Sequence, residues 1–487
     1  MRSPAPKPAR GAVTFVVLAV SITVFTLLQS LVVPVMSTFE SEYDTDQATV
    51  TWMLTGYLLT ASIATPLLGR VGDVVGKTRM LTVTLLILSL GSLLAAIAPN
   101  IGWLIFARVV QGAGGGVMPL AFGIARDEFR ERMSTALAVL ASLGAVGFGF
   151  GIVLAGPIVD AFGHQGLFWI PMVATLAAAV ATILFVPPSP VRTPGRLPIL
   201  PAVLLAAWLA ALLLAISKGN AWGWGSPRVL GLLVAAAVFA SLWVWIEMRV
   251  PVPMIDMQMM RVRGVWSANA VAGFVGFGMF ASFGFLPQFL QTPQAAGYGF
   301  GATITESGHM MLPSAVASFL VGFGTASLVH RLGARSVILA GTLTTAAAYA
   351  SLALWHTETW QVYAATIVQG LGSGLVFASL AGVVIAAVPP EQTGVASGMN
   401  ANIRTIGGSL GSAAMAGIVT AQLGAAGFPV ERGYTIGFAM LAIAMVAAAV
   451  ASLGIPNLHE QATGSRLADA DNAELGFVPA AAAPDRR

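Results

Sequence analysis

The chain has 487 residues, of which 57% are hydrophobic and only 9% are charged. Soluble domains carry about 25% charged residues, so most of the surface of this protein must face the apolar interior of a lipid bilayer. This balance excludes a soluble enzyme, a nucleic-acid-binding module and a disordered scaffold. The absence of cysteine also excludes disulfides, thiolate metal sites and thiol catalysis.

Apolar segments of spanning length, about 20 residues each, predict fourteen transmembrane helices in three groups. The first six cover residues 14–36, 47–68, 80–98, 101–125, 134–156 and 166–186. Two more cover residues 198–217 and 227–246, and the last six cover residues 264–290, 304–328, 336–354, 358–388, 394–421 and 434–455. The prediction is an all-α integral membrane protein with two six-helix bundles and two additional central helices.

These groups divide the chain into seven parts. In order they are a cytoplasmic N-terminus (1–13), a first six-helix bundle (14–186), a Pro-rich cytoplasmic linker (187–197), two additional helices (198–246), a cytoplasmic loop (247–263), a second six-helix bundle (264–455) and a tail (456–487). The tail is rich in Ala, Asp and Glu without periodicity, which predicts disorder.

The basic residues predict the orientation of the chain. Of the 24 Lys and Arg residues, 16 fall in the N-terminus or the loops on one side of the predicted spans and 3 on the other. The positive-inside rule places the first side, and both termini, in the cytoplasm. The first loop on the opposite side is purely acidic, with Glu40, Glu42, Asp44 and Asp46.

The loop after the second span combines glycines with charged residues. Gly69 and Gly76 let helix ends approach closely, and Asp73 can pair with a cation or accept bonds from a neighbouring helix N-terminus. Together with Lys77 and Arg79, this arrangement suits a cytoplasmic latch that closes in one state and opens in another. The alternative is a tight basic turn that only sets the topology.

The fourth span contains Arg108 and Gln111, followed by glycines at 112 and 114–116. An arginine inside an apolar helix costs roughly 2.5–3.5 kcal/mol on insertion scales, so Arg108 must face a polar interior. The alternative to a functional role is a structural arginine bonded to carbonyls of a neighbouring helix.

The fifth span carries glycines at 144, 147, 149 and 151 and ends in Gly156-Pro157. Repeated glycine on one helix gives a smooth, bendable surface against which another helix can move.

These motifs resemble those of the major facilitator superfamily. The run from Gly69 to Arg79 resembles motif A, with a weaker copy at Ser327 to Arg335, as internal repeats predict. The Arg108 run resembles motif B, whose arginine is implicated in proton coupling. Gly151, Gly156 and Pro157 fall in a run that resembles motif C, the antiporter motif of exporters, although Asp160 stands where that motif has glycine.

Residues 396–411 resemble a run of the fourteen-helix drug:proton antiporter (EmrB/QacA-like) family. The resemblance implies a bacterial plasma-membrane transporter that exports hydrophobic or amphiphilic compounds by alternating access with proton antiport. Its expected partners are the substrate, protons and membrane lipids, with a monomeric chain, no nucleic acid, no cofactor and no metal. The alternatives are a translocator of lipids or endogenous metabolites, with or without proton coupling, and, more remotely, an intramembrane enzyme.

The chain departs from this family in its first helix, where Gln29 stands at the usual acid position. Glutamine cannot carry a proton, so a titrating group must lie elsewhere. The candidates for proton coupling are Asp160, Arg108, Glu306 and His309. Glu306 and His309 share a helix face because they are three residues apart. A carboxylate in partly apolar surroundings has a raised pKa, which would suit Glu306 for proton uptake. The alternative for Asp160 and Glu306 is a structural role at a helix end.

Polar and aromatic residues of the spans are candidates for a substrate cavity. They are Phe25, Gln29, Gln111, Phe277, Phe280, Asn400 and Arg404. Aromatic surfaces can repack around varied apolar ligands, and a cavity arginine without an acid in the first helix would disfavour organic cations. The alternative for each aromatic residue is lipid contact or helix packing.

Overall fold

The structure is a computed structural model that describes residues 8–129, 133–189, 199–251, 253, 255, 257–388, 393–424 and 427–456. Within these ranges the fold is helical, and strand-type pairing is limited to an isolated bridge between Leu423 and Pro429. Most of the predicted linker and nearly all of the predicted tail lie outside the described residues.

The first bundle follows the six predicted segments. Its helices are α1 (Pro8–Leu31), η1 (Val33–Val35), α2 (Met36–Glu42), α3 (Gln47–Val75), α4 (Lys77–Ala96), α5 (Ile101–Gly112), η2 (Ala113–Gly116), α6 (Val117–Glu128), α7 (Met133–Phe162) and α8 (Gly166–Phe185). The first segment breaks at Pro34, which cannot donate a backbone hydrogen bond. The fourth segment tightens into a 3₁₀ turn at its run of glycines.

The rest of the chain forms the inserted pair and the second bundle. The inserted pair is α9 (Ile199–Trp222) and α10 (Pro227–Glu247). The second bundle contains η4 (Met259–Arg261), α11 (Arg263–Gln291), η5 (Gln294–Ala296), α12 (Ile304–Leu332), α13 (Ala334–Leu354), α14 (Thr359–Ala386), α15 (Thr393–Val419) and α16 (Glu431–Ser452).

Among the described residues, 11 helices are long and apolar enough to cross a membrane. They include α9 and α10 but not α7, α12 or α15. The predicted all-helical membrane fold is therefore confirmed, and the count of fourteen crossings stays a prediction.

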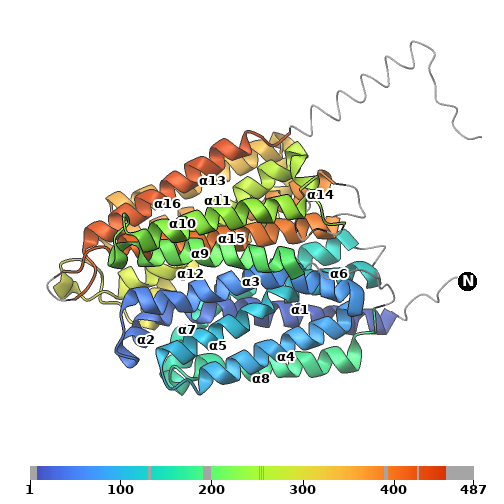
Figure 1. Cartoon of the computed structure of the whole chain (residues 1–487), viewed down its shortest axis with the longest axis horizontal. Coiled ribbons are helices and arrows are strands. Elements are labelled where there is room, and N and C mark those ends of the chain that lie inside the picture. Colours follow the sequence, from blue (N-terminus) through green and yellow to red (C-terminus); the bar gives the residue numbers. More distant parts are fainter. Residues whose placement is uncertain are drawn as a thin grey trace, which may run out of the picture.

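The two bundles lie side by side (Figure 1). The pairing of α1 with α7 in the first bundle has its counterpart in the pairing of α11 with α15 in the second. In the first bundle, α7 packs closely on α1, because a Cβ on Gly151 would lie 2.6 Å from the Leu27 carbonyl oxygen. In the second bundle, α11 packs closely on α15 where Gly276 faces the Arg404 carbonyl. Small residues permit such close approach of helix backbones, so the glycines hold each bundle together as a compact unit.

The inserted pair lies along the boundary between the bundles (Figure 1). On one side, the indole nitrogen of Trp52 in α3 donates to the Ser217 hydroxyl of α9 at 3.0 Å. On the other side, the Asn220 amide of α9 donates to the Gly417 carbonyl of α15. Helix α9 therefore contacts both bundles.

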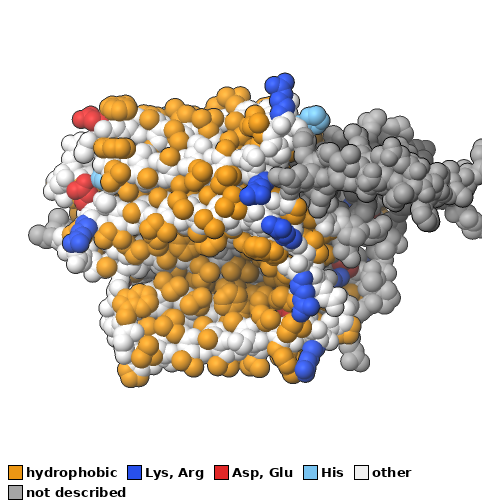
Figure 2. Space-filling view, turned by 90° about the horizontal axis from the view of Figure 1, so that it is seen from above, with side chains coloured by type: hydrophobic (Ala, Val, Ile, Leu, Met, Phe, Trp, Pro, Cys, Tyr) orange, Lys and Arg blue, Asp and Glu red, His pale blue; other side chains and the backbone are white. Residues whose placement is uncertain are grey.

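The surface of the molecule matches a membrane environment. Figure 2 shows hydrophobic side chains over most of one face, with Lys and Arg gathered mainly toward one end, and a hollow lined by hydrophobic side chains. We call the end that carries Lys77, Arg126 and Arg331 the basic end, and the end that carries the acidic loop at 40–46 the acidic end.

Candidate functional site

A buried ion pair joins two helices at the basic end. The Lys77 ammonium lies 2.7 Å from the Asp127 carboxylate, and both side chains are at most 10% exposed. Gly123, one turn before Asp127 on α6, leaves room for the lysine, since a Cβ there would lie 2.9 Å from Lys77 Cδ. Gly76 has φ +117°, which turns α3 into α4 and places Lys77 at the start of α4. Sequence reasoning singled out Lys77 but missed Asp127.

The other charged residues of this loop are more exposed. The Asp73 carboxylate lies 3.8 Å from the Arg70 guanidinium on the same helix, and Arg79 is exposed. Arg70 also donates to the Pro253 carbonyl, 3.4 Å away in the loop after α10. Gly69 faces Pro119 of α6, since a Cβ added at Gly69 would lie 3.7 Å from Pro119 Cβ. The loop therefore contacts α6 and the segment that leads to the second bundle.

The weaker copy of this loop has the same backbone course but a different chemistry. Gly333 has φ +80° and joins α12 to α13, as Gly76 joins α3 to α4. Buried Ala334 stands at the position of Lys77. The second half therefore repeats the turn without the lysine of the ion pair.

Arg108 lies fully buried inside the first bundle. Its Nε donates to the Met53 carbonyl of α3 at 3.3 Å, and another guanidinium nitrogen donates to the Gln111 side-chain oxygen at 2.7 Å. Gln111 donates in turn to the Ser92 hydroxyl of α4 at 2.9 Å. The guanidinium also stacks over the Tyr57 ring at 4.5 Å. One guanidinium nitrogen has no partner, so this cluster retains one donor for an acceptor group.

Aromatic side chains fill the middle of the interface between the bundles. Phe148 of α7 lies 6.0 Å from Phe280 and 5.1 Å from Phe283 of α11, measured between ring centroids. Phe280 packs into the core of the first bundle although it belongs to the second. Phe25 and Gln29, one turn apart on α1, are both buried.

The remaining cavity candidates lie within the second bundle. Arg404 is half-buried, with its guanidinium 5.3 Å from the centre of the Phe377 ring. Asn400 donates to the Asn269 side chain at 2.9 Å and so joins α15 to α11. Phe277, on α11, is half-buried. Asn400 is thus placed in a helix contact, and Arg404 in a cation–π contact.

Amide side chains cross the bundle interface at the acidic end. Gln47, at the start of α3, donates to the Gln288 side chain of α11. Gln291, one turn later on α11, donates to the Pro34 carbonyl at 2.6 Å and accepts from the Ser37 hydroxyl. Sequence reasoning missed all three glutamines. We call the contacts of Gln47, Gln288 and Gln291 the amide network.

A second contact crosses the acidic end between α7 and α12. The Thr305 hydroxyl donates to the Asp160 carboxylate at 2.9 Å. Gly156, one turn before Asp160, faces the Thr305 backbone, and a Cβ there would lie 2.6 Å from Thr305 Cα. Pro157 follows inside the helix. Gly156 therefore lies at the interface and allows α7 to touch α12, whereas Gly151 packs α7 onto α1 within the first bundle.

The structure corrects the surroundings expected for Glu306. Its side chain is exposed rather than partly apolar, and it accepts hydrogen bonds from the Thr303 backbone N–H at 2.8 Å and the Thr303 hydroxyl at 3.0 Å. Thr303 and Glu306 form a capping box that starts α12, and these bonds favour the ionised carboxylate. His309 is exposed one turn later.

We expect replacement of Gln291 by alanine to open the acidic end. The substitution removes two bonds that cross the interface, to Pro34 and Ser37, and neutral hydrogen bonds contribute about 1 kcal/mol each. The open state should gain roughly one to two orders of magnitude in population. Ile152 of α7 is buried in the interface, where it joins the core of the second bundle. Because the chain has no cysteine, an Ile152→Cys probe can be labelled alone with a membrane-impermeant maleimide. Gln165→Ala, at the exposed start of α8, is the control; equal labelling of both variants would contradict the prediction.

The fold and these contacts define a polytopic helical membrane protein in which two repeated bundles meet along an interface that is hydrogen-bonded at the acidic end. The sequence matches the Major Facilitator Superfamily over residues 18–298 and 268–479. The chain belongs to this superfamily, and the protein is a membrane transporter rather than an enzyme.

Individual relatives agree with this assignment. The chain is 29% identical over 400 residues to the multidrug resistance protein B homolog of Mycobacterium tuberculosis, covering 79% of this chain and 72% of that protein. It is 25% identical over 422 residues to the tetracenomycin C resistance and export protein of Streptomyces glaucescens, covering 84% and 76%. The crystal structure of the human organic anion transporter MFSD10 superposes with a TM-score of 0.62 at 14% identity, covering 92% of this chain and 100% of that one.

Proposed function

We propose that the protein exports hydrophobic or amphiphilic compounds by alternating access. The observation that carries the proposal is the bundle interface, which is bonded across at the acidic end and lined by aromatic side chains at mid-depth. Such an interface can separate at either end while the apolar middle holds a ligand. The names of the relatives, which include a multidrug resistance protein and an antibiotic export protein, favour export.

Within the superfamily, we propose that the chain is one of the fourteen-helix drug:proton antiporters of a bacterial plasma membrane. The inserted pair α9 and α10 supports this placement, because it adds two apolar helices of spanning length between the bundles. The basic end then faces the cytoplasm, together with both termini, and the acidic end faces outward.

Proton entry is the proposed driving force, and Asp160 is its leading site. This carboxylate lies at the contact between the bundles, so protonation would change a bond that crosses the interface. Glu306 is a weaker candidate because Thr303 of the same helix cap occupies its carboxylate. Arg108 is the buried cation whose free donor could hold a carboxylate or substrate oxygen.

A second candidate function is the movement of lipids or endogenous metabolites without proton coupling. The observation that favours it is Gln29, which is buried on α1 and cannot ionise. In this mechanism the same two bundles would move without a titrating group in the first helix.

Transport by purified protein in liposomes with an imposed pH gradient tests both candidates. Coupled export predicts substrate movement together with proton movement, and substrate movement without it supports the second candidate. Asp160→Asn should abolish the proton movement, whereas Glu306→Gln should leave it within about twofold of the wild type. A preference for permanent cations such as ethidium over neutral or anionic compounds would contradict the cavity role of Arg404, which stacks on Phe377 without an acid partner in the described ion pairs.

A further inference from the structure

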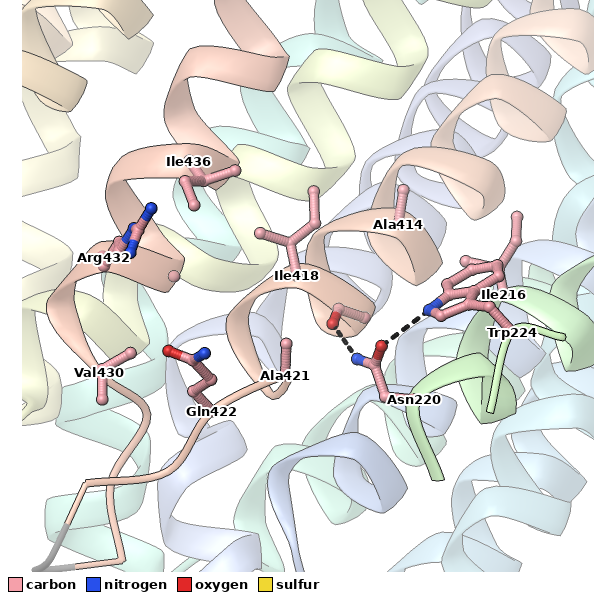
Figure 3. Close-up of a pocket in the computed structure, with 12 residues that line it drawn as sticks. Ile216, Asn220, Trp224, Ala414, Ile418, Ala421, Gln422, Val430, Arg432 and Ile436 are labelled. Atoms are coloured by element: carbon pink, nitrogen blue, oxygen red, sulfur yellow. Dashed lines mark hydrogen bonds between the residues drawn. The ribbon is translucent and has the colours of Figure 1, made fainter. Parts of the chain in front are cut away.

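A pocket of about 610 Å³ lies at the acidic end between α9, α15 and α16 (Figure 3). It lies apart from the contacts that join the two bundles, and none of the sequence motifs falls in it. Its volume is within the range of about 300–1,000 Å³ that is typical of small-molecule sites. Its lining combines apolar side chains with a few polar ones.

The polar lining residues lie nearer the acidic end than the isoleucines in each of the three segments that form the pocket. On the α15 side, Ala414 and Ile418 lie on the helix, which ends at Val419, and Gln422 follows in the connecting loop. On α9, Asn220 comes one turn beyond Ile216 toward this end, and Figure 3 shows Gln422 beside the connecting loop with Ala414 farther along the helix. The amide and guanidinium groups of the lining therefore lie toward the end of the protein, together with Ala421 and Val430, and the isoleucines lie toward its middle.

The first turn of α16 adds a positive charge to this pocket. Arg432 lines it one turn before Ile436, and Figure 3 shows its guanidinium directed toward Ile436. None of the lining residues is acidic, and no ion pair of the described residues involves Arg432. The neighbouring Glu431 lies 2.8 Å from His356 instead.

The amide in the pocket is already engaged. Asn220 donates to the Gly417 carbonyl and accepts from the Trp224 indole nitrogen at 3.0 Å. Both bonds are drawn in Figure 3. Arg432 is therefore the lining group with charge to offer to a ligand.

We infer that this pocket binds an anionic phospholipid of the outer leaflet. The phosphate would contact Arg432, and an acyl chain would lie along Ile216, Ile418 and Ile436. The order of polar and apolar groups matches that of a lipid in the bilayer, whose headgroup lies at the surface and whose acyl chains extend toward the middle. Ile436 is 46% exposed, so the groove is open on the side of α16. This inference does not depend on what the protein exports, and it gives the inserted helix α9 a role as one wall of a lipid site.

Quenching of tryptophan fluorescence by brominated lipid tests the inference, because Trp224 lines the pocket. Brominated phosphatidylglycerol, added to the full chain in detergent, should quench a saturable part of the emission, and Trp224→Phe should remove that part. Arg432→Gln should weaken the apparent affinity about fivefold, as expected for one basic side chain at a lipid surface. Arg228→Gln is the matched control, because Arg228 lies at the same end but stacks over Trp222 outside the lining.

A second variant guards against a change in folding. Ala421 is an exposed lining residue, so Ala421→Leu should fill the mouth of the pocket and weaken quenching without disturbing the core. Three results would each overturn the inference. The first is equal quenching by brominated phosphatidylcholine, and the second is equal lipid affinity of the Arg432→Gln and Arg228→Gln variants. The third is that inorganic phosphate or an exported compound competes as effectively as phosphatidylglycerol.

Discussion

Replacing Gly156 by alanine is expected to hold the acidic end open and to stop transport. The added Cβ would lie 2.6 Å from Thr305 Cα and 2.7 Å from Thr305 N, and these backbone atoms cannot yield without moving α12 away from α7. Overpacking of this kind costs about 1–3 kcal/mol, so the open state should gain roughly 5- to 150-fold. Labelling of the Ile152→Cys probe by an impermeant maleimide measures this gain.

Gly322→Ala is the matched control for Gly156→Ala. Gly322 lies on α12, and a Cβ there would meet no atom within 4 Å. The control should therefore retain transport and the wild-type labelling rate. Transport by the Gly156→Ala variant would contradict the prediction, because the acidic end would then close without the contact between α7 and α12.

Replacing Lys77 by methionine is expected to produce the largest loss of stability of any single charge removal in the loop from 69 to 79. The substitution leaves Asp127 buried without its partner 2.7 Å away, and loss of one member of a buried ion pair typically costs about 3–5 kcal/mol. Thermal unfolding in detergent should show a clear decrease in the midpoint. Lys77→Met combined with Asp127→Leu should recover much of the loss, because no unpaired charge remains.

Asp73→Asn provides the comparison for the Lys77 prediction. Asp73 and Arg70 lie 3.8 Å apart with about a third of each side chain exposed, and exposed ion pairs contribute at most about 1 kcal/mol. The double variant Lys77→Met/Asp127→Leu provides a further check on the Lys77 prediction. If it were as unstable as Lys77→Met alone, the lysine would act through its packing against Gly123 rather than through the charge of Asp127.

The sequence predicted the helices well because length and apolar character determine them. The predicted segment 227–246 corresponds to α10 at Pro227–Glu247, and 166–186 corresponds to α8 at Gly166–Phe185. The prediction stopped too early where a helix continues with less apolar residues: α3 was expected to end at 68 but extends to Val75. Hydropathy marks the membrane-embedded part of a helix, whereas hydrogen bonding continues beyond it.

The contacts between distant segments were harder to predict. Asp127 was not among the predicted site residues, because nothing in its local sequence shows that it packs against Lys77, 50 positions earlier. The sequence did contain a signal for Gln47, Gln288 and Gln291. Polar side chains at the ends of apolar helices commonly join helices by hydrogen bonds, so these residues could have been predicted as helix contacts. Their partners still depend on how the bundles pack.

Glu306 shows a local pattern that the sequence did contain. Thr303 precedes it by three residues and an apolar run follows, which is the pattern of a capping box. The capping box agrees with the alternative interpretation of Glu306 as a helix-end acid rather than with the expected apolar surroundings. Asp160 differs, because its partner Thr305 lies on another helix and only the packing of α7 against α12 brings the two together.

The position of α9 has a consequence for how compounds reach the protein. Helix α9 is bonded to α3 through one hydroxyl, at Ser217, and to α15 through Asn220, which Trp224 also holds. Helix α9 has one such bond to each bundle, but it packs more extensively on α15 than on α3. When the bundles separate, we therefore expect the bond to α3 to break first, so that the inserted pair moves with the second bundle. A lateral opening to the bilayer then forms between α3 and α9. Through it a compound dissolved in the membrane would enter the protein directly from the lipid, without first passing through water.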